Sequence, residues 1–275
     1  MIPAAFDYVA PTTVEEALAA LAQAGEDAKV LGGGQSLLPV LRMRLNAPEM
    51  VIDLTRIDAL RGISEDGDTL VIGAMTTHHE VATSHLVLAH AAVLAEAAAT
   101  VADPQIRHRG TLGGALVHAD PAGDLGAPVL ALDAELVVAG PGGERRIPAA
   151  DFFVDLFETV VGDDELLVAI RIPKHTGWGG AYEKFVRVSH QWSIVAVAAL
   201  AKDGQAKVAL TNMGSTPLRA SATEEALAGG ASVEDAAAKA AEGANPPSDL
   251  NGDSDYRAHL ARVLTRRALS RALGE

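Results

Sequence analysis

Two glycine-rich segments are the part of this sequence best suited to chemistry. The first runs Gly32-Gly33-Gly34-Gln35-Ser36 into Leu37, and the second runs Thr111-Leu112-Gly113-Gly114-Ala115. Residues without a Cβ let the backbone bend so that several N–H groups point toward one anion. Each segment alone is equally typical of a tight turn between packed elements. Together they predict a binding site for a diphosphate.

The first segment also resembles part of a nicotinamide dinucleotide-binding unit. A strand, glycines, a helical stretch and a second strand precede Asp53, which follows the glycines by about twenty residues. The match is incomplete, because Leu37 stands where a third Gly or Ala belongs and Pro39 falls in the first turns of the helix. No Gly-Lys-Ser/Thr follows, which excludes a P-loop. A nicotinamide-dependent oxidoreductase therefore stays open, as does a non-redox scaffold in which both segments are only turns.

The histidines do not have the spacing of a metal site. No His-Glu-x-x-His is present, and we expect no metal ligands. Four of them fall in one probable surface helix, where we expect them to be solvated: His78, His79, His85 and His90. His118 and Asp120 follow the second glycine segment directly, so they are candidates for holding sugar or phosphate hydroxyls of a ligand.

No nucleophile elbow, Gly-x-Ser-x-Gly, occurs, so we assign no catalytic residue. The 275 residues carry a net charge of -14 with no basic stripe, which argues against nucleic acid. Cysteine is absent, which excludes disulfides and cysteine-held iron–sulfur clusters on this chain. A redox role would therefore need an organic cofactor. No leader or bilayer-spanning run is visible, so we expect a cytoplasmic protein.

Local patterns predict the elements that position these segments. Thr12 and Thr13 precede a helix that ends near Gly25, and an Asp66-Gly67 turn indicates a hairpin over 63–73. The Gly and Pro content of 103–115 predicts an irregular loop. The other expected elements are strands at 28–31, 50–54 and 135–139 and helices at 77–101 and 124–132.

From Glu165 onward the pattern changes to four successive strands and then helices. The last two strands are joined by an Asp203-Gly204 turn, and the final helix covers 255–273 with Leu260, Val263 and Leu264 on one face. Strands followed by helices indicate an α+β domain. We place a domain boundary near His175, which divides the chain into 1–175 and 176–275.

Several motifs in order resemble the FAD-binding medium subunits of molybdenum hydroxylases, the xanthine dehydrogenase family. The likeness is nearest in layout to the medium subunit of aerobic carbon monoxide dehydrogenase. The motifs are FDYVAPTTVEEALAAL, VLGGGQSLLPVLRMRL, VIDLTRI, RHRGTLGGALVHADPAGDL, ELLVAIRIP and AYEKFVRV. The resemblance implies a PCMH-type FAD-binding domain of two α+β subdomains, followed by a small C-terminal domain of sheet plus helices.

The resemblance also implies site residues. Both glycine segments would wrap the FAD diphosphate, Asp124 would contact the adenosine side, the backbone of Leu167 would contact the adenine, and Lys184 would lie near the flavin. Four positions depart from the family pattern: Gly32 where Ala is common, His108 where Asn is common, Leu112 where Ile is common, and Ala115 where Asn is common. Ala115 removes a side-chain amide, which is worth on the order of 1 kcal/mol.

The resemblance finally implies partners. A large subunit would carry molybdopterin and oxidise the substrate, and a small subunit would carry two iron–sulfur clusters. The assembly would be a dimer of heterotrimers that passes electrons to a quinone or similar acceptor. The substrate is not written in this chain: carbon monoxide, an aldehyde, a purine or another heterocycle all fit.

Overall fold

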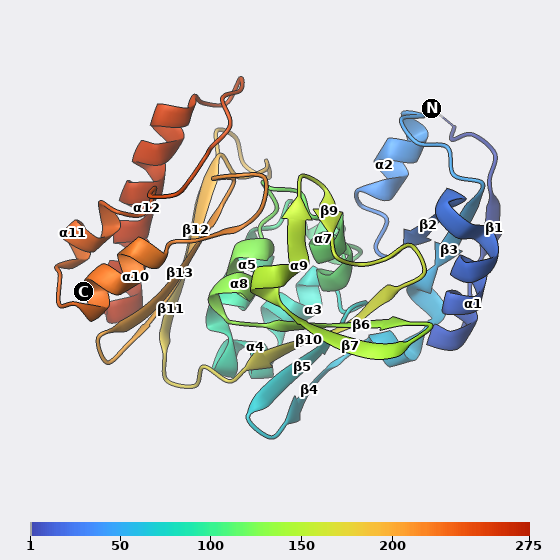
Figure 1. Cartoon of the computed structure of the whole chain (residues 1–275), viewed down its shortest axis with the longest axis horizontal. Coiled ribbons are helices and arrows are strands. Elements are labelled where there is room, and N and C mark those ends of the chain that lie inside the picture. Colours follow the sequence, from blue (N-terminus) through green and yellow to red (C-terminus); the bar gives the residue numbers. More distant parts are fainter. Residues whose placement is uncertain (1) are drawn as a thin grey trace.

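The computed structural model describes residues 2–275 as three lobes in a row (Figure 1). The N-terminal lobe holds a parallel sheet of order β1-β3-β2, formed by β1 (Asp7–Val9), β2 (Ala28–Leu31) and β3 (Met50–Asp53). Helix α1 (Val14–Ala24) begins at Thr13, whose hydroxyl accepts from the Glu16 N–H, and ends at Gly25 with φ 63°. This confirms the helix boundaries that the capping residues predict. Helix α2 (Leu37–Arg42) follows the first glycine segment.

The middle lobe is built on an antiparallel sheet of order β4-β5-β10-β6-β7. The predicted hairpin is confirmed, but Asp66 pairs with Thr69, so its turn is Gly67-Asp68, one residue later than the predicted Asp66-Gly67. A second hairpin joins the two strands at the other edge. The strands are β4 (Ile63–Asp66), β5 (Thr69–Gly73), β6 (Glu135–Gly140), β7 (Gly143–Pro148) and β10 (Leu166–Pro173).

Helices cover this sheet, and one sequence prediction about them is wrong. The single helix predicted over 77–101 is three helices, because Ser84 caps a new one and Ala91 leaves helical geometry with ψ 47°. The helices of the lobe are α3 (His78–Thr83), α4 (His85–His90), α5 (Ala92–Thr100), α6 (Pro104–Arg107), α7 (Leu112–His118), α8 (Gly126–Ala131) and α9 (Ala149–Phe152). A small hairpin of β8 (Phe153–Asp155) and β9 (Glu158–Thr159) completes it.

The C-terminal lobe is an antiparallel sheet of order β11-β12-β13-β14 with helices on its outer face (Figure 1). The chain leaves β10 at Pro173 and enters this sheet at Gly179, so the predicted boundary near His175 falls between two sheets. Its elements are β11 (Gly179–Phe185), β12 (Val195–Lys202), β13 (Gln205–Thr211), β14 (Leu218–Arg219), α10 (Ser221–Ala228), α11 (Val233–Ala237) and α12 (Ser254–Leu273).

The C-terminal sheet is buried on both faces. Along β12, Val195 and Val197 pack into one core with α12, while Ala196 and Ala198 join the core of the middle lobe. Successive strand residues point to opposite faces, so this alternation places helices on both sides. The small side chains let α5 and α8 approach closely. The architecture confirms the expected α+β class.

Candidate functional site

The two glycine segments lie against each other, although eighty residues separate them in the sequence. A Cβ placed on Gly33 would lie 2.1 Å from the Arg109 carbonyl oxygen and 2.6 Å from the Gly110 Cα. A Cβ on Gly32 would lie 3.1 Å from the Thr111 hydroxyl. Only a residue without a side chain fits at Gly33, because real Cβ atoms do not approach other atoms so closely. The glycine pattern therefore encodes a backbone-to-backbone contact between the two segments.

The first segment keeps its backbone donors available. Within residues 2–275, the N–H groups of Gly33, Gly34, Gln35 and Ser36 find no hydrogen-bond acceptor in the protein. The Gln35 side chain donates to the Gly33 carbonyl at 3.1 Å, and Gly34 has φ 76°, a left-handed geometry suited to glycine. Consecutive free amides on a bent backbone form a concavity that fits an anion.

The second segment differs from the loop that the sequence predicts. Thr111 caps helix α7, its hydroxyl accepting from the Gly114 N–H at 3.2 Å, so Gly113 and Gly114 lie inside the first turn of a helix. The Leu112 N–H donates to the Thr76 carbonyl at 2.9 Å, and the Gly113 N–H to the Ala74 carbonyl at 2.8 Å. The Ala115 N–H is also bonded, to the Thr111 carbonyl. These amides are used inside the protein, so the segment forms a wall of the site more than a set of donors.

Leu167 lies near the second segment, in strand β10. It is buried in β10, next to an irregularity in the pairing with β6. The carbonyl of the following residue, Val168, accepts from the Ala74 N–H at 3.0 Å, and the Ala74 carbonyl accepts in turn from Gly113. The predicted adenine contact of Leu167 remains a prediction.

His118 and Asp120 lie at the far end of α7 from Thr111. The His118 ring stacks on Phe157 with ring centres 5.1 Å apart. One Asp120 carboxylate oxygen accepts from the Ala122 N–H at 2.9 Å and so forms a turn. These contacts do not test their predicted role in holding ligand hydroxyls, which remains a prediction.

Asp124 and Lys184 come together in a buried cluster between the middle and C-terminal lobes. The Lys184 ammonium donates to one Asp124 carboxylate oxygen at 2.7 Å. The other oxygen accepts from the Tyr182 hydroxyl at 2.8 Å and from the Ser193 hydroxyl at 2.9 Å. All three partners donate, so the arrangement fits the carboxylate form of Asp124.

Burial and neighbours act in opposite directions on this cluster. Burial raises the pKa of Asp124, while the Lys184 ammonium and the two hydroxyl donors lower it. Burial also raises the pKa of Tyr182 well above its usual value, and the adjacent Asp124 charge raises it further. The tyrosine is therefore a permanent donor at neutral pH. Both oxygens of Asp124 are engaged by the protein, so its side chain joins two lobes.

One histidine prediction is wrong. His78 is buried, with 4% of its surface exposed, and its Nδ1 has no hydrogen-bond partner in residues 2–275. Burial, assisted by the nearby Arg107 charge, lowers the pKa of His78 to about 4. The ring packs directly on Gly110, where a Cβ would come within 2.8 Å of it. His79 is half-buried and stacks on His108, and only His85 is solvated as expected.

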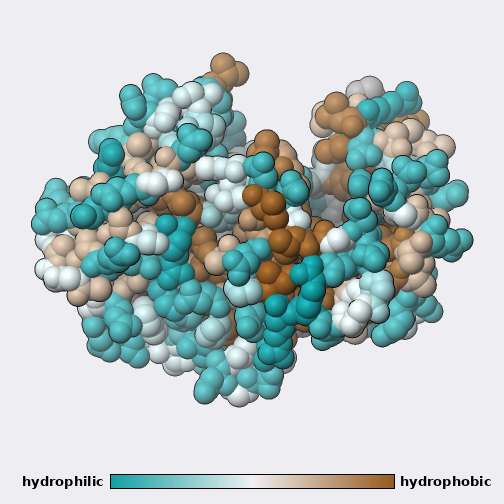
Figure 2. Space-filling view, in the orientation of Figure 1, coloured by the Kyte–Doolittle hydropathy of each residue, from teal (hydrophilic) through white to brown (hydrophobic). Residues whose placement is uncertain are grey.

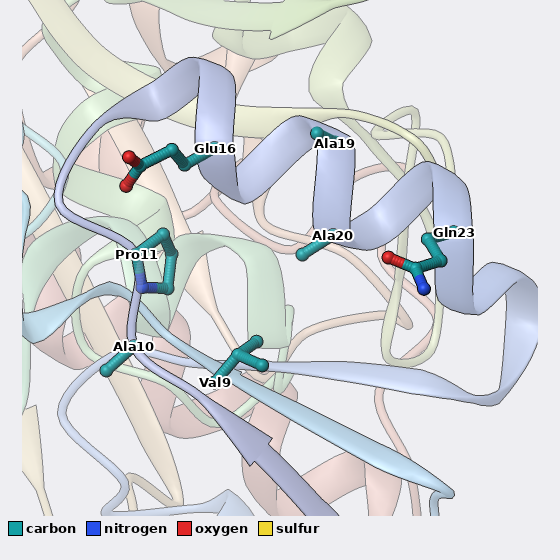
Figure 3. Close-up of a pocket in the computed structure, with 7 residues that line it drawn as sticks. All are labelled: Val9, Ala10, Pro11, Glu16, Ala19, Ala20 and Gln23. Carbon is teal, nitrogen blue, oxygen red and sulfur yellow. The ribbon is translucent and has the colours of Figure 1, made fainter.

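The surface is hollowed between the N-terminal lobe and the middle of the molecule, as Figure 2 shows. A separate shallow hollow of about 380 Å³ lies between the end of β1 and α1, away from the glycine segments (Figure 3). Its only acid, Glu16, already accepts from the Thr12 N–H and hydroxyl. No group of three or more His, Cys, Asp or Glu suited to a metal occurs in the described part of the chain.

The arrangement fits a ligand with a diphosphate. The free amides of Gly33 to Ser36 supply donors, no acidic side chain lies within that segment, and the glycine contact leaves the backbone open to close approach. Sequence reasoning misses Gly110, Tyr182 and Ser193, which complete the glycine contact and the Asp124 cluster. Gly110 and Tyr182 stand within the quoted motifs RHRGTLGG and AYEKFVRV, whereas Ser193 carries no signal beyond its residue type.

Two family models match the chain. Residues 4–175 match the FAD binding domain in molybdopterin dehydrogenase, and residues 180–272 match the CO dehydrogenase flavoprotein C-terminal domain. Across residues 2–275, no helix has both the length and the apolar character needed to cross a bilayer.

Full-length relatives agree with these matches. The chain is 43% identical to the carbon monoxide dehydrogenase medium chain of Hydrogenophaga pseudoflava, covering 99% of this chain and 98% of that one. It is 36% identical to the 6-hydroxypseudooxynicotine dehydrogenase complex subunit alpha of Paenarthrobacter nicotinovorans, covering 99% and 96%. A solved structure of the H. pseudoflava carbon monoxide dehydrogenase, lacking the Mo-pyranopterin moiety, superposes with a TM-score of 0.95 at 43% identity, covering 100% and 99%. The chain thus belongs to the family of FAD-binding medium subunits of molybdopterin dehydrogenases, and FAD is its cofactor.

Proposed function

We propose that this chain is the electron-transfer subunit of its complex, taking electrons from iron–sulfur clusters on a small partner subunit and delivering them to an external acceptor. The observation that supports this most is the contact of Gly33 with Gly110, which leaves the amides of the first segment open to a diphosphate. When bound, FAD supplies a ring that accepts and releases two electrons. The chain's own residues bind and orient that ring.

The division of labour follows from the side chains present. With no cysteine, the chain offers no thiolate ligands, so cysteine-held clusters belong to another subunit. We propose a large molybdopterin subunit and a small iron–sulfur subunit as partners, assembled as a dimer of heterotrimers. A quinone, which takes up two electrons and two protons, is the proposed acceptor. A cytoplasmic location stays a prediction from the sequence.

Residue roles follow from the geometry. We assign diphosphate binding to the amides of Gly33 to Ser36, at the entrance of α2. The segment from Thr111 to Ala115 forms the opposite wall, and Leu167 belongs to the same hydrophobic core as Leu112. Asp124 and Lys184 hold the C-terminal lobe on the middle lobe. The division of the chain at His175 is part of the same proposal.

The substrate of the complex is read on the large subunit and stays open. The relatives above are named for carbon monoxide and for 6-hydroxypseudooxynicotine, two compounds with no common shape. The part that these names share is the class of reaction, which is dehydrogenation. Copurification of the partner subunits and a screen of carbon monoxide, aldehydes and N-heterocycles on the intact complex would identify the substrate.

A reconstitution experiment tests the electron-transfer role. The purified chain should bind about one FAD and should oxidise none of the candidate substrates alone. In the intact complex, substrate should bleach the flavin absorbance, and a soluble quinone should restore it. A complex in which substrate reduces the clusters but never the flavin would refute the role.

A further inference from the structure

His78 is tied to the second glycine segment through the backbone. It is the first residue of α3, directly after Thr77, whose side chain and that of Glu80 form a reciprocal cap. The His78 N–H donates to the Gly110 carbonyl at 2.9 Å, and Thr77 forms an antiparallel bridge with Thr111. The start of α3 and the second segment are therefore joined through their backbones.

The His78 ring also packs directly on the contact between Gly33 and Gly110, which we call the glycine junction. A Cβ on Gly110 would lie 2.8 Å from both Cδ2 and Nε2 of the ring. Gly110 in turn meets Gly33, whose own Cβ would come within 2.6 Å of the Gly110 Cα. The imidazole, Gly110 and Gly33 form a chain of contacts that leads from the core of the middle lobe to the free amides.

An imidazole at this place is costly for the fold. Its Nδ1 is buried without a partner, and burying an unpaired polar atom destabilises a protein. An apolar ring would carry no such unpaired atom. Unpaired buried polar groups are uncommon in native proteins, and each calls for an explanation.

We propose that His78 is a positioning residue of the FAD site, whose ring sets the place of Gly110 and thereby the presentation of the Gly33 to Ser36 amides to the diphosphate. This inference rests on the diphosphate placement proposed above. The inference assigns to His78 an effect on binding of the diphosphate and no direct effect on binding of the flavin ring.

The test compares ligands that have and lack the diphosphate. Full-length chain stripped of FAD is titrated with FAD, ADP and riboflavin, and urea unfolding is measured in parallel. The His78→Ala variant should weaken FAD and ADP by a common factor of about tenfold or more and leave riboflavin unchanged. His78→Phe, which keeps a planar ring but is larger than an imidazole, should restore part of the loss.

His175→Ala is the matched control, because His175 is equally buried but lies in the linker, bonded to the Pro173 carbonyl and Lys207. It should lower stability without changing any ligand affinity. Equal affinities for FAD in wild type and His78→Ala would overturn the inference, as would an equal loss for riboflavin. Failure of the wild type itself to bind ADP or FAD would instead overturn the proposed diphosphate site.

Discussion

The glycine junction and the Asp124 cluster both join segments far apart in the sequence, but by opposite means. At the junction, Gly33 meets Gly110 through bare backbone, with no side chain from either residue. In the cluster, Asp124 meets Lys184 and Tyr182 through buried side chains, which donate hydrogen bonds to its carboxylate. The junction depends on the absence of side chains, and the cluster depends on paired polar side chains.

The contrast shows how each region responds to change. The junction has no room for a Cβ, so any added atom must move a backbone segment. The cluster has its charges balanced, so removing one partner leaves the other buried and unpaired. We expect changes at the junction to act on the cofactor and changes at the cluster to act on stability. The following substitutions test that separation.

Gly33→Ala should abolish the junction. The new Cβ would fall 2.1 Å from the Arg109 carbonyl oxygen, so the two segments must separate. We expect FAD affinity to fall by about a hundredfold or more. Flavin fluorescence titration measures this. Gly142→Ala is the control, because nothing lies within 4 Å of a Cβ there, and it should leave FAD binding unchanged. Normal FAD affinity in Gly33→Ala would show that the junction is irrelevant to the cofactor.

Lys184→Met should destabilise the protein by about 3–5 kcal/mol, because it leaves the Asp124 carboxylate buried without its cation. Urea unfolding measures the loss. Adding Asp124→Asn to this variant removes the orphaned charge and should recover part of the stability. A double variant no more stable than Lys184→Met alone would mean that the pair does not act as a unit.

The free energy of unfolding should decrease as the pH is lowered, because His78 is buried as the neutral imidazole. Its pKa is about 4 in the folded chain, and about 6.5 in an unfolded one, so between these values only the unfolded state takes up the proton. Stability should be fully present above pH about 6.5 and fall by about 3 kcal/mol as the pH drops toward 4. His78→Phe should flatten this difference. Parallel pH profiles of the two proteins would show that His78 does not titrate in this way.

Gly32→Ala should have the smallest effect, although Gly32 is adjacent to Gly33. Its Cβ would lie 3.1 Å from the Thr111 hydroxyl, which can shift at the expense of the cap on α7. Such a cap is worth about 1 kcal/mol. We expect a loss of that size in thermal unfolding and nearly normal FAD binding. A loss of FAD equal to that of Gly33→Ala would mean that the junction extends to Gly32.

Much of the local structure is predictable from the sequence, because it depends on neighbours along the chain. Thr13 and Gly25 bound α1 through hydrogen bonding and backbone geometry that those residue types favour. The hairpin turn at Asp203-Gly204 is specified in the same way, and so is the turn at Gly67-Asp68, which lies one residue later than predicted. Residue type also singles out the two glycine segments, but their contact through Gly33 and Gly110 is visible only in the structure.

Which backbone amides and polar side chains of the site stay free depends on the tertiary structure. The amides of 112 and 113 are consumed by carbonyls of 76 and 74, so the second segment became the first turn of a helix instead of a loop. His78 is buried and not solvated, because its helix packs on Gly110. Asp124 is engaged by Lys184 and Tyr182 from another lobe. Each outcome depends on acceptors and charges brought from distant parts of the chain, which local residue patterns do not specify.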